Sequence, residues 1–527
     1  MGLSIREKVS YALGDGAANI AWRGVSTFLM IYYLDVFGLS PVVVGTLMLV
    51  ARFSDGISDV LMGAVCDRTK SKYGKFRPWV LWTAVPLAII LSLLFTCPNW
   101  DTSWKIAYAY ATYIMFTLIY TANNIPYGAL MGVMTPDDKE RTSLGSFRMV
   151  GAFAGGMLVQ GLLLFLVAYF GNTNPEIKVS QIEEQKQQVV ITFPNNVEKV
   201  NIQTEHGIAT LSATGENAIA GAEEPTQSKS FSAKANTPYT FTVEGESDLQ
   251  KDDFRIVDQT VGYSHAIYLL SIFLAFFLIL TFLGTKERVE APKTQESNIK
   301  EELKDLCTNK PWIILLVVGL LFNIYNCTKQ GITVIYFTHY IHNQLMASYY
   351  MVGLMIASIF GAMLTTPLSR RFGKKVLFIG ALIFSGAVNS LLWLCGQTDT
   401  TMIFAVGMLS ELSAAIFPTL FFTMLGDVAD YSEYVNHRRS TGLIYSAGSF
   451  ATKFGGGIAG ALTGWILGMY NYQTSADGAA PGIVMLMSWV PALLCMIAAV
   501  LMAIYPINQK RQEEITLELE KRRAEEA

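Results

Sequence analysis

The sequence predicts an all-α membrane protein with twelve transmembrane helices in two six-helix bundles and a small, β-rich extracytoplasmic insert between helices 5 and 6. Three observations lead to this expectation. Residues of the set AVILMFWYC make up 52% of the chain, and charged residues only 15%. Apolar runs of about 20 residues, the length that spans a bilayer as a helix, recur along the chain. Lysine and arginine gather in every second loop between these runs.

Twelve apolar runs set the expected number of helices. The first is longer than the core of a signal peptide and lacks a small-residue cleavage site, so we expect it to be retained. The expected spans are 10–37, 41–65, 78–97, 105–134, 143–170, 261–284, 311–340, 345–369, 374–396, 401–425, 441–470 and 481–505.

The distribution of basic residues predicts the orientation. Of the 39 Lys and Arg residues, 26 lie in the two tails and in alternate loops, whereas the short loops between carry none. Basic residues stay on the cytoplasmic side, so both termini are expected there. A net charge of −3 gives no electrostatic reason to expect nucleic acid. The six cysteines lie in or beside apolar runs, so we expect no disulfide framework.

Composition also divides the chain into domains. Within 171–260, four stretches (QQVVITFP, EKVNIQT, GIATLSATG and TPYTFTVEG) are typical of short strands, with a disordered loop as the alternative. A partner of this insert on the outer side is left open. The expected parts are 1–170 with 261–284 (first bundle), 171–260 (insert), 285–310 (cytoplasmic linker), 311–505 (second bundle) and 506–527 (cytoplasmic tail).

Three charged residues are regularly spaced within the second span. Arg52, Asp55 and Asp59 follow an i, i+3, i+7 pattern, which puts both carboxylates on one helix face, a turn apart. A lone charge at mid-bilayer costs about 2.5–3.5 kcal/mol. Two close carboxylates also repel each other unless a cation or proton lies between them. The pattern therefore indicates a site for Na⁺ or H⁺, with a structural ion-pair network around Arg52 as the alternative.

Other buried cations suggest further roles. Lys453 lies beside a glycine run in the eleventh span, where its ammonium could keep the two acids charged while no cation is bound; snorkelling is the alternative. Arg23 lies on one helical stripe with Asp15 and Asn19.

Lys329 lies in the middle of the seventh span. Together with Arg23 it could bind an anionic group of a substrate. The alternative is that Lys329 pairs with Glu411, and Arg23 with a nearby acid.

The stretch YTANNIPYGAL places polar and aromatic side chains around Pro126, which we expect to break the fourth helix. Amides, hydroxyls and aromatic faces suit a saccharide, whereas polar contact between helices is the alternative. No metal-ligand cluster, nucleotide loop or hydrolytic triad is found, so neither an enzyme nor a cofactor is expected. The side chains concerned are Tyr120, Thr121, Asn123, Asn124 and Tyr127.

Several motifs together resemble the glycoside–pentoside–hexuronide:cation symporter family. They are SYALGDGAANIAW, YYLDVFGLS, VGTLMLVARFSDGISDVLMG, RTKSKYGKFRPW, NIPYGAL and GDVADYSEY. The resemblance implies a major facilitator fold, alternating access and a place in a bacterial inner membrane. It implies that Asp55 and Asp59 bind the coupling cation, as metal ligands if that cation is Na⁺, with Thr121 contributing and Lys453 nearby.

The resemblance also implies a sugar pocket and a gate. It assigns Asn19, Tyr120, Asn124 and Arg148 to the pocket, with Arg52 close by. It makes Asp427, Asp430 and Arg439 candidates for gating contacts between the bundles.

The chain departs from the family pattern at four positions in this pocket. Family members that transport galactosides have carboxylates where Asn19 and Asn124 stand, and Gly128 and Pro418 replace stacking tryptophans. Trp22 and Tyr120 could take over the stacking. Fewer acids, with Arg23 and Lys329 added, favour an anionic saccharide such as a hexuronide.

The expected function is uptake of a saccharide coupled to Na⁺ or H⁺, and Thr121 beside the acids favours Na⁺. The expected partners are a saccharide, a monovalent cation and membrane lipid. Two alternatives are a membrane sugar sensor that does not transport and a cation-coupled lysolipid transporter. A transporter should accumulate sugar, and this uptake should change when Asp55 or Asp59 loses its charge. A sensor should bind sugar without accumulating it.

Overall fold

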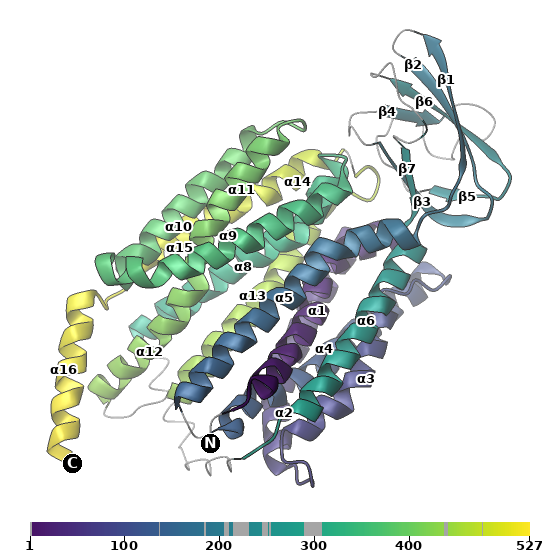
Figure 1. The fold of residues 1–527 in the computed structure, drawn as a ribbon. Helices are drawn as coiled ribbons and strands as arrows, with labels where there is room; N and C mark the ends of the chain where they lie inside the picture. The colour runs from purple at the N-terminus through teal and green to yellow at the C-terminus, as the bar shows by residue number, and fades with distance from the viewer. Residues whose placement is uncertain are drawn as a thin grey trace. The chain divides into compact units, whose positions relative to one another are not determined.

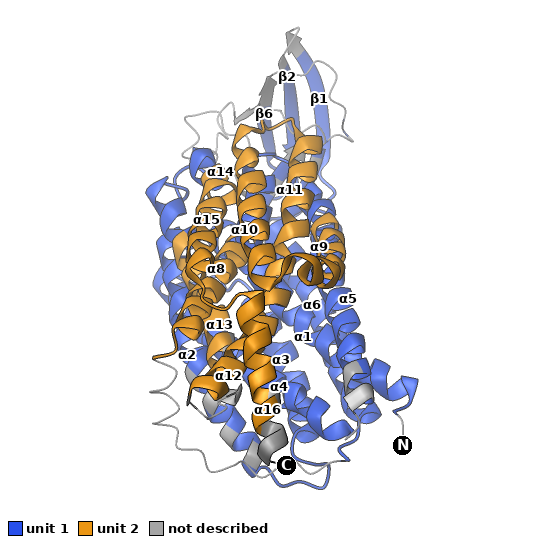
Figure 2. Cartoon of the chain, turned by 90° about the vertical axis from the view of Figure 1, so that its left-hand side faces the viewer, with its two compact units in different colours: residues 1–291, 330–352, 463–483 blue, residues 292–329, 353–462, 484–527 orange. Residues whose placement is uncertain are grey.

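The chain folds into two compact units, coloured separately in Figure 2. Unit 1 comprises residues 1–291, 330–352 and 463–483, and unit 2 comprises 292–329, 353–462 and 484–527. The structure, a computed structural model, describes residues 3–135, 138–183, 186–204, 210–213, 231–244, 251, 254–288, 308–436, 441–476 and 478–526.

Six long helices form most of unit 1 and agree with the first six predicted spans. Pro126 lies inside α4, so the prediction that it breaks this helix is wrong. Proline removes one backbone hydrogen bond, and a transmembrane helix tolerates this where neighbouring groups compensate. The helices are α1 (Ile5–Ile31, continued by a π-helical turn at Tyr32–Val36), α2 (Pro41–Arg68), α3 (Arg77–Leu94), α4 (Thr102–Met134), α5 (Asp138–Phe170) and α6 (Gln259–Gly284).

Glycines bring α1 and α5 into backbone contact. A Cβ atom at Gly151 would overlap the carbonyl group of Ala12, and one at Gly155 would overlap that of Gly16. Small residues allow this approach in a membrane, where packing replaces the hydrophobic effect as the driving force. The crossing places Asp15 of α1 against the face of α5 that carries Arg148.

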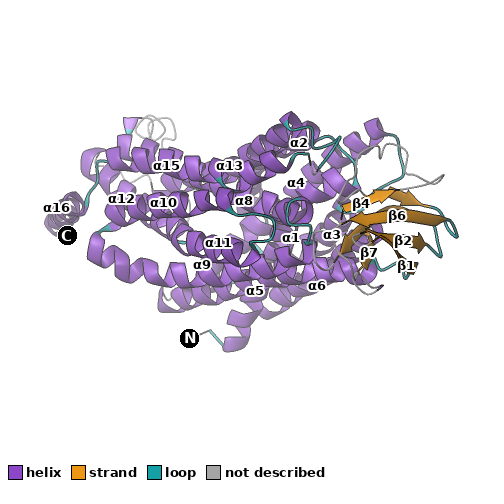
Figure 3. Cartoon of the chain, turned by 90° about the horizontal axis from the view of Figure 1, so that it is seen from above, coloured by secondary structure: helices purple, strands orange, loops and turns teal. Residues whose placement is uncertain are grey.

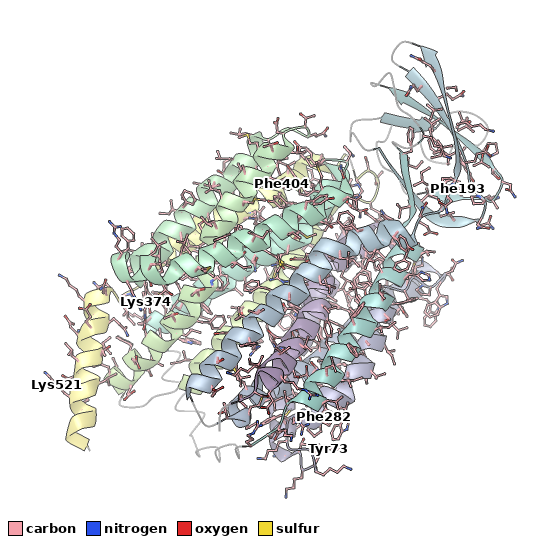
Figure 4. All side chains as sticks on the ribbon, viewed as in Figure 1. Tyr73, Phe193, Phe282, Lys374, Phe404 and Lys521 are labelled. Carbon is pink, nitrogen blue, oxygen red and sulfur yellow. The ribbon has the colours of Figure 1, made fainter. Side chains whose placement is uncertain are left out.

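The insert is a small β-structure, and Figure 3 shows its strands gathered in one place. One antiparallel sheet has the order β1-β2-β6-β4, and the second has the order β5-β3-β7. Buried side chains such as Val189, Ile191, Phe193 and Phe241 form its core; Figure 4 labels Phe193. The strands are β1 (Glu176–Glu183), β2 (Lys186–Thr192), β3 (Val197–Thr204), β4 (Thr210–Ala213), β5 (Phe231–Ala233), β6 (Pro238–Glu244) and β7 (Phe254–Asp258).

The four predicted strands are present as β2, β3, β4 and β6, so the described part of the insert is folded. The insert also continues directly into the helices. Asn172 bridges to Val257 of β7, and the Asp258 carboxylate caps α6 by accepting hydrogen bonds from the backbone N–H groups of Thr260 (3.0 Å) and Val261 (3.2 Å).

The remaining helices follow the linker, and most of their residues form unit 2. Here α10 packs against α11, α12 and α15 around buried residues such as Leu382, Phe378 and Phe417. Their bounds are α8 (Lys310–His339), α9 (Gln344–Phe372), α10 (Lys374–Ser390, then a 3₁₀ turn at Leu391–Leu394), α11 (Thr400–Ala414), α12 (Ile416–Asn436), α13 (Thr441–Met469), α14 (Ala480–Met487), α15 (Trp489–Ile504) and α16 (Gln509–Glu526) (Figure 1).

Three details of unit 2 differ from the prediction. The span predicted at 401–425 is the pair α11 and α12 and extends to Asn436. The last span is interrupted at Ser488 between α14 and α15. There, Asn389 of α10 donates hydrogen bonds to the carbonyls of Met487 (2.9 Å) and Ser488 (3.0 Å). The C-terminal tail contains a helix, α16, that packs on α12.

Hydropathy supports the membrane fold. Among the described residues, nine helical segments are long and apolar enough to cross a membrane. The C-terminal helix α16 is not among these nine segments, and neither are the long helices α1, α4 and α13. These are also the helices that carry many of the predicted site residues.

Candidate functional site

Two carboxylates and one hydroxyl meet between α2 and α4. The Oγ1 atom of Thr121 lies 3.0 Å from Oδ1 of Asp55 and 3.0 Å from Oδ1 of Asp59. A threonine hydroxyl has one proton, so it can donate to only one of the two oxygens at a time. The other contact then joins two acceptors. That contact becomes favourable when a proton or a cation lies among the three oxygens.

Arg52 neutralises one of the two carboxylates. Its Nη1 atom lies 3.1 Å from Oδ2 of Asp55, and both side chains are buried. Its guanidinium also lies 4.4 Å from the centre of the Trp22 ring. The ion pair expected as the alternative is therefore present for Asp55.

Aromatic and polar side chains continue from this cluster along α1 and α4. The Trp22 and Tyr120 rings lie 5.6 Å apart, so the two predicted stacking residues are neighbours. The Asn19 amide donates a hydrogen bond to the carbonyl of Asp15 one turn earlier (3.0 Å). Arg23 and Asn124 are half-buried on α1 and α4. Asn123 donates to the Thr83 hydroxyl (2.7 Å), so it makes the helix–helix contact expected as the alternative.

Arg148 has a counter-charge that the sequence did not indicate. Its Nε atom lies 3.3 Å from Oδ1 of Asp15, across the close contact of α1 with α5. Its guanidinium lies 5.5 Å from the ring centre of Tyr127, which stacks on Tyr11 at 4.7 Å. About a third of the Arg148 side chain remains exposed, so this residue can still contact a ligand.

In unit 2, Lys329 contacts Glu411, as the alternative expected. The Lys329 Nζ atom lies 3.9 Å from Oε2 of Glu411 and donates a hydrogen bond to the Tyr325 hydroxyl at 3.2 Å. Ser358 donates a hydrogen bond to the other oxygen of Glu411 at 2.8 Å. Lys329 is only 4% exposed, so its charge depends on these neighbours.

Lys453 also belongs to unit 2, on α13. Its expected place beside Asp55 and Asp59, which lie in unit 1, stays a prediction. The glycine run next to it does permit close packing, because a Cβ atom at Gly455 would lie 2.9 Å from the carbonyl oxygen of Leu320 on α8.

The expected gating residues lie on and after α12. Both carboxylate oxygens of Asp427 lie 2.7 Å from the Nζ atom of Lys374, which Figure 4 labels at the start of α10. Asp430 is half-buried one turn later. Arg439 lies outside the described residues. The contact of Asp427 with Lys374 therefore joins two helices of the same unit.

The chemistry of the oxygen cluster suits a hard monovalent cation. Among the described residues, no group of three or more His, Cys, Asp or Glu side chains could hold a metal ion. The Asp55, Asp59 and Thr121 cluster instead offers two carboxylates and a hydroxyl. Oxygen ligands fit Na⁺, and paired carboxylates also fit a shared proton.

Comparison with known proteins identifies the class. A family model described as MFS/sugar transport protein matches residues 10–193 and 251–509. The inner membrane symporter YicJ of Escherichia coli (strain K12) is 31% identical over 510 residues, covering 95% of this chain and 91% of that protein. The isoprimeverose transporter of Lactiplantibacillus pentosus is 29% identical over 526 residues, covering 99% of this chain and 92% of that one.

A solved structure agrees in fold. The crystal structure of a D-xylose-proton symporter superposes with a TM-score of 0.57 at 13% identity, covering 94% of this chain and 97% of that chain. The fold and these matches define an integral, multi-pass membrane transporter of the major facilitator type, not an enzyme. The chain belongs to the MFS/sugar transport protein family, among the glycoside–pentoside–hexuronide:cation symporters. The family match omits residues 194–250, so much of the insert is an addition to the family fold.

Proposed function

We propose that Asp55, Asp59 and Thr121 bind the coupling cation of this symporter. The observation that supports the proposal is the single Thr121 hydroxyl, 3.0 Å from an oxygen of each carboxylate. Without a cation the cluster contains one acceptor–acceptor contact and two carboxylates that repel each other across one helix turn. A bound Na⁺ or H⁺ relieves both. The hydroxyl supplies a third oxygen, which favours Na⁺ over H⁺.

We infer that Arg52 links this site to the sugar, because it contacts both Asp55 and Trp22. When a cation neutralises Asp55 and Asp59, Arg52 is attracted less strongly to Asp55 and is freer to contact the sugar beside Trp22. Cation and sugar then favour each other's binding, and linkage requires this effect to be reciprocal. If only the empty or the doubly loaded carrier changes conformation, the cation gradient drives sugar uptake. We place the protein in a bacterial inner membrane with both termini cytoplasmic.

Neutralising the acids tests the cation site. Asp55→Asn and Asp59→Asn should abolish accumulation driven by a cation gradient while sugar exchange across the membrane persists. Asp101→Asn is the matched control, because Asp101 is exposed and makes no side-chain hydrogen bond at the start of α4. Accumulation by either site variant that still follows the cation gradient would overturn the assignment.

We further propose that the sugar is anionic and that Arg23, on the α1 stripe with Asp15 and Asn19, meets its acidic group. Asp15 is the counter-charge of Arg148, and Glu411 lies next to Lys329. Trp22 and Tyr120 are adjacent and provide the aromatic face for the ring. Arg23 is half-buried and directly follows Trp22 on α1, next to this aromatic pair, so it is the first choice and Lys329 the second.

A binding screen tests the charge of the substrate. Neutral and anionic forms of the same glycosides, such as a glucoside and its glucuronide, are compared with and without Na⁺. Anionic forms should bind more tightly, and Arg23→Gln should reduce that preference without changing the affinity for the neutral forms. Preference for the neutral sugars would defeat the anionic assignment while leaving the cation site intact.

A further inference from the structure

A second polar cluster lies at the end of α1, away from the cation site. The Nε2 atom of His339 lies 2.8 Å from Oδ2 of Asp35, and the Tyr472 hydroxyl donates a hydrogen bond to Oδ1 of Asp35 at 2.8 Å. The His339 and Tyr472 rings meet edge to face at 5.4 Å. His339 and Tyr472 are each 4% exposed. One carboxylate, itself 11% exposed, therefore binds two groups that lie far from it in the sequence.

Local backbone structure places each member of this cluster. Asp35 lies in the π-helical turn that ends α1, and such turns often mark functional sites because they shift a helix face. His339 is the last residue of α8. Asn471 adopts a left-handed conformation (φ +54°) just after α13, and the N–H of Tyr472 then bonds back to the carbonyl of Leu467 at 3.1 Å.

Two other contacts join the same helix ends. Gln344, at the start of α9, donates a hydrogen bond to the Tyr263 hydroxyl of α6 at 3.2 Å. Gly464 of α13 lies against α2, where a Cβ atom would be 2.8 Å from the Cα atom of Gly45. These ends of α8, α9 and α13 lie in residues 330–352 and 463–483, which group with unit 1 although most of each helix lies in unit 2.

We propose that Asp35 is a positioning residue of the transport cycle that holds the sugar path closed at the face formed by the ends of α1, α8 and α13. This inference builds on the proposed transport function. Its hydrogen bonds to His339 and Tyr472 can form only while the ends of α8 and α13 lie against α1. Opening that face separates it from His339 and Tyr472 and removes the fit of Gly464 on α2. The closed state is thus stabilised in two ways: by the hydrogen bonds of Asp35 with His339 and Tyr472, which we call the latch, and by the close packing of Gly464 on α2.

A cysteine at Ser26 reports whether this face is open. The Ser26 hydroxyl lies 3.5 Å from Oε1 of Gln330, so closure covers it. It lies nine residues before Asp35 on α1, about 13 Å deeper at the helical rise. In a background whose native cysteines are replaced, a membrane-impermeant thiosulfonate is added from outside to cells that express Ser26→Cys. The measured quantity is the labelling rate without sugar.

Two independent changes should open the face. Asp35→Asn should raise the labelling rate about tenfold, the factor that corresponds to weakening one hydrogen bond to a charged group. Gly464→Leu should raise it through steric overlap. The controls are Asp101→Asn, which makes no latch contact, and Gly380→Leu, since nothing lies within 4 Å of a Cβ at Gly380. Neither control should change the rate.

Unchanged labelling in both Asp35→Asn and Gly464→Leu, with thermal unfolding like that of the parent, would overturn the latch. If Asp35→Asn does not fold, Tyr472→Phe removes a single donor and should give a smaller rise; no rise counts against the proposal. Labelling needs neither cation nor sugar. Failure of the cation assignment is therefore seen in uptake by the Asp55 and Asp59 variants, and failure of the latch is seen in labelling.

Discussion

Thr121→Val removes the hydroxyl between Asp55 and Asp59 and keeps the shape of the side chain. Hydrogen bonds to charged groups contribute about 1.5–3 kcal/mol. Thr121 is only 2% exposed, so water has little room to replace the hydroxyl. Each 1.4 kcal/mol corresponds to a factor of ten in affinity. The cation concentration that half-activates sugar uptake should therefore rise roughly 10- to 100-fold.

The assay is initial sugar uptake into membrane vesicles over a series of Na⁺ concentrations at fixed pH, repeated over a pH series without Na⁺. Thr121→Ser is the matched control, because it keeps the hydroxyl and should stay close to the parent. If Thr121→Val and Thr121→Ser are activated at the same cation concentration, Thr121 does not bind the cation. A shift in the Na⁺ series alone identifies Na⁺ as the coupling ion.

Three further predictions concern packing and charge. Gly155→Val should lower the free energy of unfolding by about 1–3 kcal/mol through overlap with Gly16, as measured by thermal unfolding in detergent. The control Gly63→Ala should have little effect on this free energy, because nothing lies within 4 Å of a Cβ atom at Gly63. Glu411→Gln should destabilise the protein by roughly 3–5 kcal/mol, because it removes a carboxylate that compensates the buried Lys329 ammonium. Lys329→Met should cost less, because the Glu411 side chain is 18% exposed. The double variant should recover part of the loss, and additive losses in the same thermal assay would show that the pair does not interact. Phe193→Ala removes a fully buried ring from the core of the insert and should lower the free energy of unfolding of the insert by about 3–5 kcal/mol. The insert should then become sensitive to protease while sugar uptake persists. Protease resistance equal to that of the parent would contradict this packing.

Local spacing predicted the part of the site that lies on one helix. Asp55 and Asp59 share a face of α2 because they are one turn apart, and Arg52 pairs with Asp55 for the same reason. Thr121 was suggested by the family resemblance, not by spacing. Its contact with both acids depends on how α4 packs on α2.

Long-range pairs could not be predicted from one sequence. Asp15 and Arg148 meet because Gly151 and Gly155 let α5 approach α1, and no local pattern links the two charges. The cluster of Asp35, His339 and Tyr472 joins three distant segments. Lys329 and Glu411 were named only as one of two alternatives, since either a substrate or an acid can compensate a buried cation.

Secondary structure was predicted mostly where periodicity was strong. The apolar spans and the strands β2, β3, β4 and β6 were found. The strands β1 and β7 were missed, although β1 alternates polar and apolar residues, and β5, with three residues, is too short to show a pattern. The helix α16 has only a narrow apolar stripe, formed by Ile515 and Leu519, and its contact with α12 stabilises it. The break at Ser488 was not predicted. Pro491 has no N–H to bond the Met487 carbonyl four residues earlier, and Asn389 of α10 satisfies that carbonyl instead.

The junction of the insert with α6 has a practical consequence for imaging. No flexible linker separates β7 from α6: Asp258 ends the strand and caps the helix, and Asn172 ties the end of α5 to the same strand. An antibody fragment raised against the folded insert would therefore be held in a fixed orientation to α5 and α6. Small membrane proteins offer few features for aligning particles in electron cryomicroscopy. The folded insert with its bound antibody fragment would supply a feature for alignment without an engineered fusion.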